Sequence, residues 1–117
     1  MLAQLPVTPG TEVQISFRHS LFGSRVEESL RIEPDGGFTL VRLRYEEART
    51  AEYYGQERAV WQQGWWVVEG RSSRLGELHL RVPSDNDLRL TVGGSVLSAV
   101  GLTQSGGLLR LAAGPCV

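Results

Sequence analysis

The chain has 117 residues, of which 41% are hydrophobic and 21% charged, as in an ordinary single globular domain. Its formal net charge of −1, with twelve arginines and no lysine spread along the chain, argues against a nucleic-acid partner. The single cysteine, Cys116, excludes an internal disulfide and a cysteine-based zinc site. No segment approaches the ~20 apolar residues that span a bilayer. We therefore expect no metal, no cofactor and no membrane span.

Glycine and proline interrupt the sequence at short intervals, and segments of alternating hydrophobicity lie between them. This pattern is typical of antiparallel strands that bury one face. We expect residues 1–117 to form one all-β domain, an antiparallel β-sandwich or barrel of about eight or nine short strands, with residues 1–11 as an irregular N-terminal arm. The expected strands are Glu12–His19, Arg25–Glu33, Phe38–Tyr45, Gln56–Gln63, Trp65–Glu69, Leu75–Val82, Leu88–Val92, Ser95–Val100 and Leu108–Ala112.

The third expected strand follows a turn at Pro34–Gly37, where proline presets φ and the glycines allow positive φ. Its apolar residues change from even to odd positions along the strand. Phe38 and Leu40 would lie on one face, whereas Val41, Leu43 and Tyr45 would lie on the other. A β-bulge or burial on both faces explains such a change.

The segment Glu46–Gly55 is rich in glutamate, alanine and arginine and fits either a helical turn or a long loop. We expect at most one short helix, within Glu46–Arg58. Further along, Gly93–Gly94 predicts a two-residue hairpin turn of the primed type.

The first two strands carry a polar pair on an otherwise apolar face. If Phe17 faces Leu30, the same register places His19 opposite Glu28 at the loop end of the hairpin. An ionised pair would raise the pKa of the histidine and lower the pKa of the glutamate. Two interpretations stay open: a ligand- or ion-recognition site that includes Ser20, or a structural ion pair. Because neighbours on a strand point to opposite faces, Ser20 does not naturally meet His19, and we expect no catalytic residue.

Five aromatic residues are concentrated in a short part of the chain: Tyr53, Tyr54, Trp61, Trp65 and Trp66. Exposed, they would form a platform on which sugars or peptides stack. As strand neighbours, Trp65 and Trp66 must face opposite sides, so at least one of them is expected in the core.

Several motifs occur in an order that resembles the bacterial and archaeal family catalogued as domain of unknown function 1850. Phe17–Ser20 has the aromatic-x-His-Ser start of that family, and Val26–Glu28 has its Val-x-Glu. Gly64–Trp65, Arg74–Val82 and Gly93–Gly94 then match its Gly-Trp step, its leucine-rich strand and its Gly-Gly hairpin. The resemblance covers nearly the whole chain.

The resemblance implies a cellular setting rather than an activity. Such proteins are often encoded beside TRAP transporters of the TAXI subclass and commonly begin with a hydrophobic export or anchor segment. We therefore expect a non-catalytic, extracytoplasmic accessory or binding domain that partners a TAXI-type TRAP transporter or its solute-binding protein. A cytoplasmic location stays open, as does a free-standing carbohydrate- or peptide-binding module that uses the tryptophan and tyrosine cluster.

Overall fold

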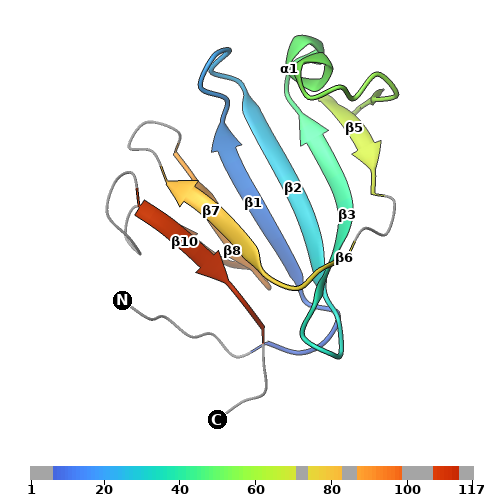
Figure 1. Ribbon diagram of the computed structural model, residues 1–117. Coiled ribbons are helices and arrows are strands. Elements are labelled where there is room, and N and C mark those ends of the chain that lie inside the picture. The colour runs from blue at the N-terminus through green and yellow to red at the C-terminus, as the bar shows by residue number, and fades with distance from the viewer. Residues whose placement is uncertain (1–6, 71–73, 83–86, 99–106, 114–117) are drawn as a thin grey trace.

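The structure, a computed structural model, describes residues 7–70, 74–82, 87–98 and 107–113 (Figure 1). These ranges form an antiparallel all-β fold with one short helix, as the alternation of apolar residues predicted. The helix, α1 (Ala48–Tyr53), lies within the segment where a helix was expected. The strands are β1 (Glu12–Arg18), β2 (Arg25–Ile32), β3 (Phe38–Tyr45), β4 (Val60–Gln62), β5 (Trp65–Glu69), β6 (Arg74–Leu75), β7 (Leu78–Val82), β8 (Arg89–Val92), β9 (Ser95–Ser98) and β10 (Gly107–Leu111).

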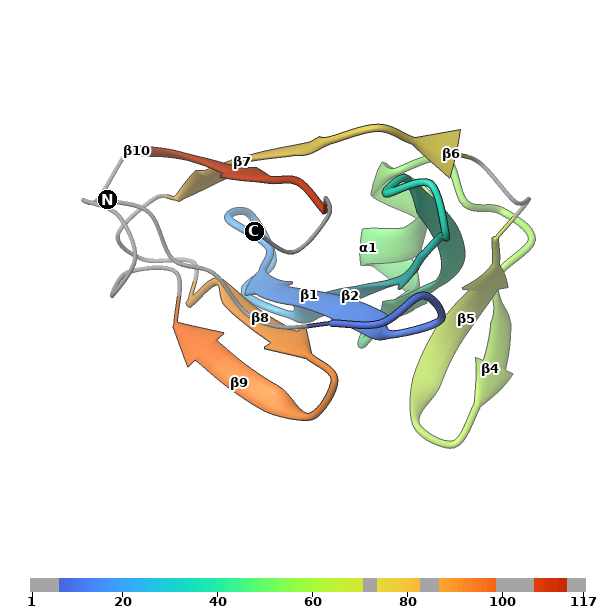
Figure 2. The same ribbon diagram turned by 90° about the horizontal axis from the view of Figure 1, so that it is seen from below.

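Eight of these strands belong to one large curved sheet, and two form a small second sheet. The large sheet has the order β4-β5-β3-β2-β1-β8-β9, with β6 paired to β3. The second sheet pairs β7 with β10, and Figure 2 shows it as a separate layer facing β1 and β8. The large sheet is not closed into a barrel, so of the two predicted architectures the structure has the sandwich-like one.

Two clusters of buried apolar side chains fill the inner face of the large sheet. The larger cluster lies under β7 and β10, and the smaller one lies at the other end, beside α1. The buried residues of the larger cluster are Val13, Ile15, Leu30, Ile32, Phe38, Leu78, Leu88 and Leu90. Those of the smaller cluster are Val26, Tyr45 and Ala51.

The register of the first hairpin differs from the predicted one. Glu28 lies opposite Ile15 instead of His19, and the backbone N–H of His19 donates to the carbonyl of Ser24 at 2.8 Å. The prediction assumed a longer loop, whereas Gly23, at φ +71°, lets the chain reverse directly between His19 and Ser24. His19 and Glu28 still share the inward face, because the observed register differs from the predicted one by an even number of residues.

Other predicted strands are confirmed in part. The parity change in β3 is a bulge, since Leu30 pairs with Leu40 while its neighbour Ser29 pairs with Arg42. The predicted strand Leu75–Val82 is divided into β6 and β7, which belong to different sheets.

The strands β4 and β9 are shorter than the predicted strands Gln56–Gln63 and Ser95–Val100. β4 begins only at Val60, because Gly55, at φ +75°, and the turn after it end α1 and occupy the first residues of the predicted strand. The last two residues of the second predicted strand lie outside the described ranges. At Gly93–Gly94 both φ angles are positive, which confirms the predicted hairpin turn between β8 and β9.

Candidate functional site

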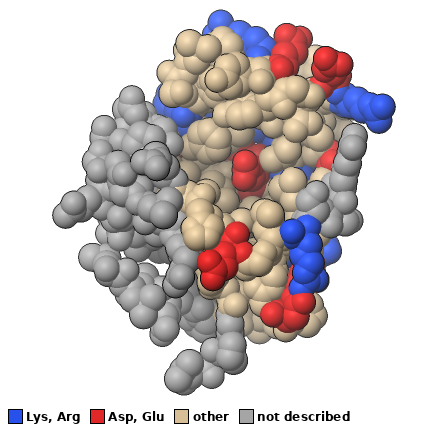
Figure 3. Space-filling view, viewed as in Figure 1, with Lys and Arg blue, Asp and Glu red and all other residues tan. Residues whose placement is uncertain are grey.

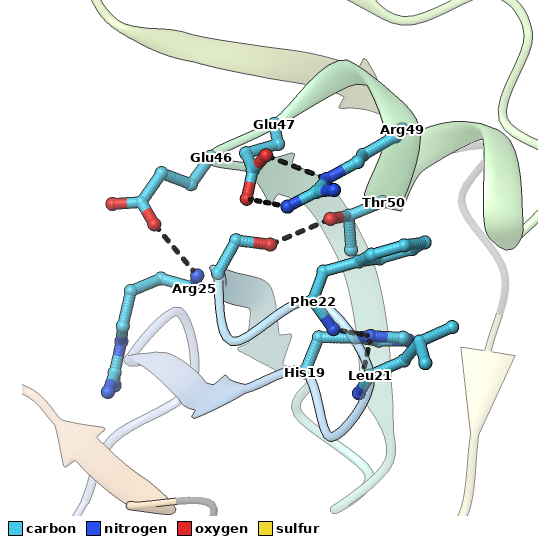
Figure 4. Close-up of polar contacts among 9 residues, drawn as sticks. His19, Leu21, Phe22, Arg25, Glu46, Glu47, Arg49 and Thr50 are labelled. Carbon is cyan, nitrogen blue, oxygen red and sulfur yellow. Dashed lines mark hydrogen bonds and ion pairs between the residues drawn. The ribbon is translucent and has the colours of Figure 1, made fainter.

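His19 is locked in the loop between β1 and β2. Its side chain is only 5% exposed, and its Nδ1 accepts the backbone N–H groups of Leu21 and Phe22, both at 3.2 Å (Figure 4). A ring nitrogen that accepts two N–H groups carries no proton, so the proton of the neutral imidazole is on Nε2. His19 therefore shapes this loop through one nitrogen and keeps the other as a donor.

Aromatic rings surround the imidazole of His19. Phe22 stacks on it, with ring centroids 5.1 Å apart. Tyr53 and Tyr54 meet it in T-shaped contacts at 4.7 and 5.5 Å. Because both tyrosines come from the end of α1, this packing fixes the helix against the loop.

Two hydrogen bonds tie the end of the β1–β2 loop and the start of β2 to α1 and to the residues before α1. The hydroxyls of Ser24 and Thr50 are 2.7 Å apart, and both residues are buried. The backbone N–H of Arg25 donates to the Glu46 carboxylate at 3.1 Å (Figure 4). A buried hydroxyl pair is costly to break, since each hydroxyl loses its partner without gaining water. The loop and the helix are thus held as one unit.

Glu28 lies on the inner face of β2 between Val26 and Leu30, two of the most deeply buried residues of the sheet. No residue in the described ranges forms an ion pair or hydrogen bond with its carboxylate. Burial raises the pKa of Glu28 above its ordinary value. The prediction that a partner would lower this pKa is wrong, because the register places His19 farther along the hairpin.

Two tyrosines lie within the electrostatic reach of Glu28. Burial, and next the charge of Glu28, raise the pKa of Tyr45 to about 12. Burial, then Tyr53 and then Glu28, raise the pKa of Tyr54. Both phenols therefore keep their protons at neutral pH. The two tyrosine rings are 5.8 Å apart, so Tyr54, which also touches His19, connects the histidine to the region of Glu28.

We call His19, Glu28, Tyr45 and Tyr54 the Glu28 cluster. Figure 3 views the inner face of the sheet and shows aspartate or glutamate atoms (red) set back among uncharged residues (tan) near the centre of the view. The cluster thus combines an acceptor that lacks a partner in the described ranges with phenol and imidazole groups able to donate. This is the chemistry of a recognition site for a ligand that carries a donor or a positive charge.

The predicted site residues are distributed unequally. His19 and Glu28 belong to the cluster, whereas Ser20 is exposed in the loop. The Nδ1 of His19 is occupied by backbone N–H groups, so the histidine does not activate Ser20 through that atom.

The five aromatic residues lie in three settings. Tyr53 and Tyr54 pack around the histidine, and Trp61 packs on Trp66 with centroids 5.4 Å apart. Trp65 is on the opposite face of β5 from its neighbour, as expected, beneath a guanidinium 4.7 Å from its ring.

Tyr45 was missed by the sequence prediction, although a signal was present. It shares its parity in β3 with Leu43, the residue opposite Glu28, and thus points to the inner face. The hydroxyl pair of Ser24 and Thr50 had no comparable signal, because it depends on how α1 packs.

Within the parts of the chain that the structure describes, no three histidine, cysteine, aspartate or glutamate residues lie close enough to hold a metal ion. Nor does any helix there have the length and apolar character needed to cross a membrane.

A family model for the domain of unknown function DUF1850 matches residues 13–98. The chain belongs to this family. The match runs from β1 into β9 and includes every member of the Glu28 cluster. No curated protein and no solved structure matches the chain.

Proposed function

We propose that this protein is a non-catalytic binding domain that works outside the cytoplasm with a TAXI-type TRAP solute transporter. The observation that supports binding is Glu28, a carboxylate on an apolar face with no partner in the described ranges. Such a group costs folding free energy unless something neutralises it. A cost of this kind is typical of functional sites, where a ligand supplies the missing partner.

The geometry around His19 favours binding over catalysis. A nucleophile must lie within reach of its base, and the base must be oriented by a third group. Here the nearest hydroxyl in sequence, that of Ser20, is exposed, and the acceptor nitrogen of His19 holds the loop instead. Binding by preorganised polar and aromatic groups needs none of these arrangements.

The transporter setting rests on the family resemblance, whose members are often encoded beside TAXI-type systems. The partner in this proposal is the solute-binding protein of such a system or its membrane component. The sheet face would present a small molecule to that partner or take one from it.

A retention experiment tests the transporter setting. The immobilised full chain is expected to retain the solute-binding protein of a TAXI-type TRAP transporter, or the membrane component of that transporter in detergent. A solute-binding protein of an unrelated transporter class, applied at the same concentration, serves as the control and should pass through. Retention of neither component, or equal retention of the control, contradicts the proposal.

A second candidate function is carbohydrate binding beside α1. An open depression of about 440 Å³ is lined by residues that include Trp66, Gln56 and Glu52, the ring and polar groups that sugars need. Trp61, 55% exposed, packs on Trp66. Soluble glycans should then quench tryptophan fluorescence, and Trp61→Ala should reduce the quenching, whereas Trp65→Ala on the other face should not. Absence of quenching by any glycan rejects this candidate.

A further inference from the structure

Glu28 is the one charged residue at the inward positions of the described strands of the large sheet. The residues opposite it, Ile15 on β1 and Leu43 on β3, are apolar, and their inward neighbours carry no charge. The arginines of the same strands alternate to the outer face, where Arg44 pairs with Glu27. The protein therefore offers Glu28 no cation from these strands.

The surroundings of Glu28 suit a cation better than an anion. Its negative charge reaches Tyr45 and Tyr54, since it contributes to the raised pKa of both phenols. The electron-rich faces of tyrosine rings attract ammonium groups, and the attraction grows in desolvated sites. On the described strands of the large sheet no arginine lies on this face, so an anion would meet the Glu28 carboxylate without a guanidinium group from those strands.

An organic cation suits the cluster better than a metal ion. Metal ions need several ligands, and no group of three histidine, cysteine, aspartate or glutamate side chains that could hold one is found in the described ranges. A primary ammonium group needs one charge-assisted acceptor, and aromatic walls cover the rest of the molecule. Glu28 with Tyr45 and Tyr54 supplies this combination.

We propose that the Glu28 cluster binds the ammonium group of a small organic amine, with the Glu28 carboxylate as its counter-ion and the tyrosine rings as its walls. This inference rests on the proposed binding function and names the ligand class. Ligand binding would give Glu28 the partner that it lacks among the described residues and would pull its pKa back down. Near neutral pH the amine would arrive already protonated, so no covalent step is involved.

The test uses three probes with the same alkyl chain: n-butylammonium, butyrate and 1-butanol. Each is titrated into the isotope-labelled full chain at pH 7, and amide chemical shifts are followed. Butylammonium should give saturable shifts centred on β2 beside Glu28. Glu28→Gln, which keeps the shape and removes the charge, should weaken this binding about tenfold or more.

Two control variants separate the contributions. Glu12→Gln removes a carboxylate from an exposed position of β1 and should leave the affinity within about twofold. Tyr54→Phe keeps the ring and should retain binding, whereas Tyr54→Ala should weaken it. Since Glu28→Gln removes a partly buried charge, this variant is expected to fold.

Equal affinity of butylammonium for wild type and Glu28→Gln would overturn the inference, and so would tighter binding of butyrate. A chain that retains the transporter component but binds no butylammonium overturns the amine inference alone. A chain that binds butylammonium through Glu28 but retains no transporter component supports the amine inference and contradicts the transporter setting.

Discussion

At the scale of single residues, Glu28 works against folding. Its pKa in the folded chain lies above the ordinary value of 4.5, and burial is the cause. Between the unfolded and folded pKa the native state binds more protons, so stability falls as pH rises. The cost of ionisation is absent below the unfolded pKa and complete above the folded pKa. At neutral pH the ionised Glu28 side chain therefore lowers the free energy of unfolding of the protein.

Replacement of Glu28 by glutamine should therefore stabilise the protein in a pH-dependent way. At pH 7, urea denaturation should give Glu28→Gln a free energy of unfolding higher by about 0.5–2 kcal/mol. The difference should shrink towards zero below pH 4, where the wild-type carboxyl is protonated in both states. Glu12→Gln should show no such trend. A Glu28→Gln variant less stable at pH 7 than the wild type would indicate a stabilising partner for the carboxylate.

Substitutions of His19 by asparagine and glutamine distinguish the contributions of its two ring nitrogens to stability. The asparagine side chain places an acceptor near the position of Nδ1, which binds the N–H groups of Leu21 and Phe22, whereas glutamine mimics Nε2. We expect His19→Ala and His19→Gln to cost about 2–3 kcal/mol of unfolding free energy, and His19→Asn to recover about 1 kcal/mol of it. Urea denaturation measures all three. Equal stability of the asparagine and glutamine variants would contradict the role assigned to Nδ1.

At the scale of elements, alternation predicted the strands well but not their register. Val13, Ile15 and Phe17 identify the inward face of β1 without any knowledge of its partner. Register depends on the length of the loop, and here the chain reverses at Gly23, whose φ is +71°. The sequence thus predicted that His19 and Glu28 share a face, but not how far apart they lie.

One buried hydroxyl pair, Ser24 with Thr50, contributes to the contact between the first hairpin and α1. Ser24→Ala and Thr50→Val each remove a hydroxyl and leave the other without its partner. We expect each single variant to lose about 1–2 kcal/mol and the double-mutant cycle to show a coupling of about 0.5–1.5 kcal/mol. Denaturation of the four proteins under one condition provides the cycle. Additivity within about 0.3 kcal/mol would show that the hydroxyls do not depend on one another.

At the scale of the whole molecule, the two sheets cover each other only in part. The second sheet covers the half of the large sheet that carries the larger core, and α1 covers the other end. The all-β class followed from the sequence because strands such as β1 and β7 alternate apolar and polar residues. The choice between sandwich and barrel did not, because it depends on whether β4 and β9, the two edges, meet. Glu28 lies on the inner face of the large sheet between its two buried clusters, and Tyr45 belongs to the smaller one.

The last prediction concerns whether both ends unfold together. Leu78 of β7 is 7% exposed in the larger core, whereas Leu75 of β6 is 42% exposed. Leu78→Ala should cost about 2–4 kcal/mol, and Leu75→Ala less than about 0.5 kcal/mol. All three tryptophans are on β4 and β5, away from β7, which pairs with β10.

If residues 1–117 form one cooperative domain, tryptophan fluorescence and far-ultraviolet circular dichroism should give one common unfolding midpoint. Leu78→Ala should shift both midpoints equally, although the tryptophans report on the opposite end of the sheet. This follows because β1, β2 and β3 connect the two clusters through backbone pairing that spans both, with one bulge in β3. A shift of the dichroism midpoint that left the fluorescence midpoint in place would show that the α1 end and the β7–β10 end unfold separately. In that case the Glu28 cluster would lie at the junction of two weakly coupled halves rather than inside one domain.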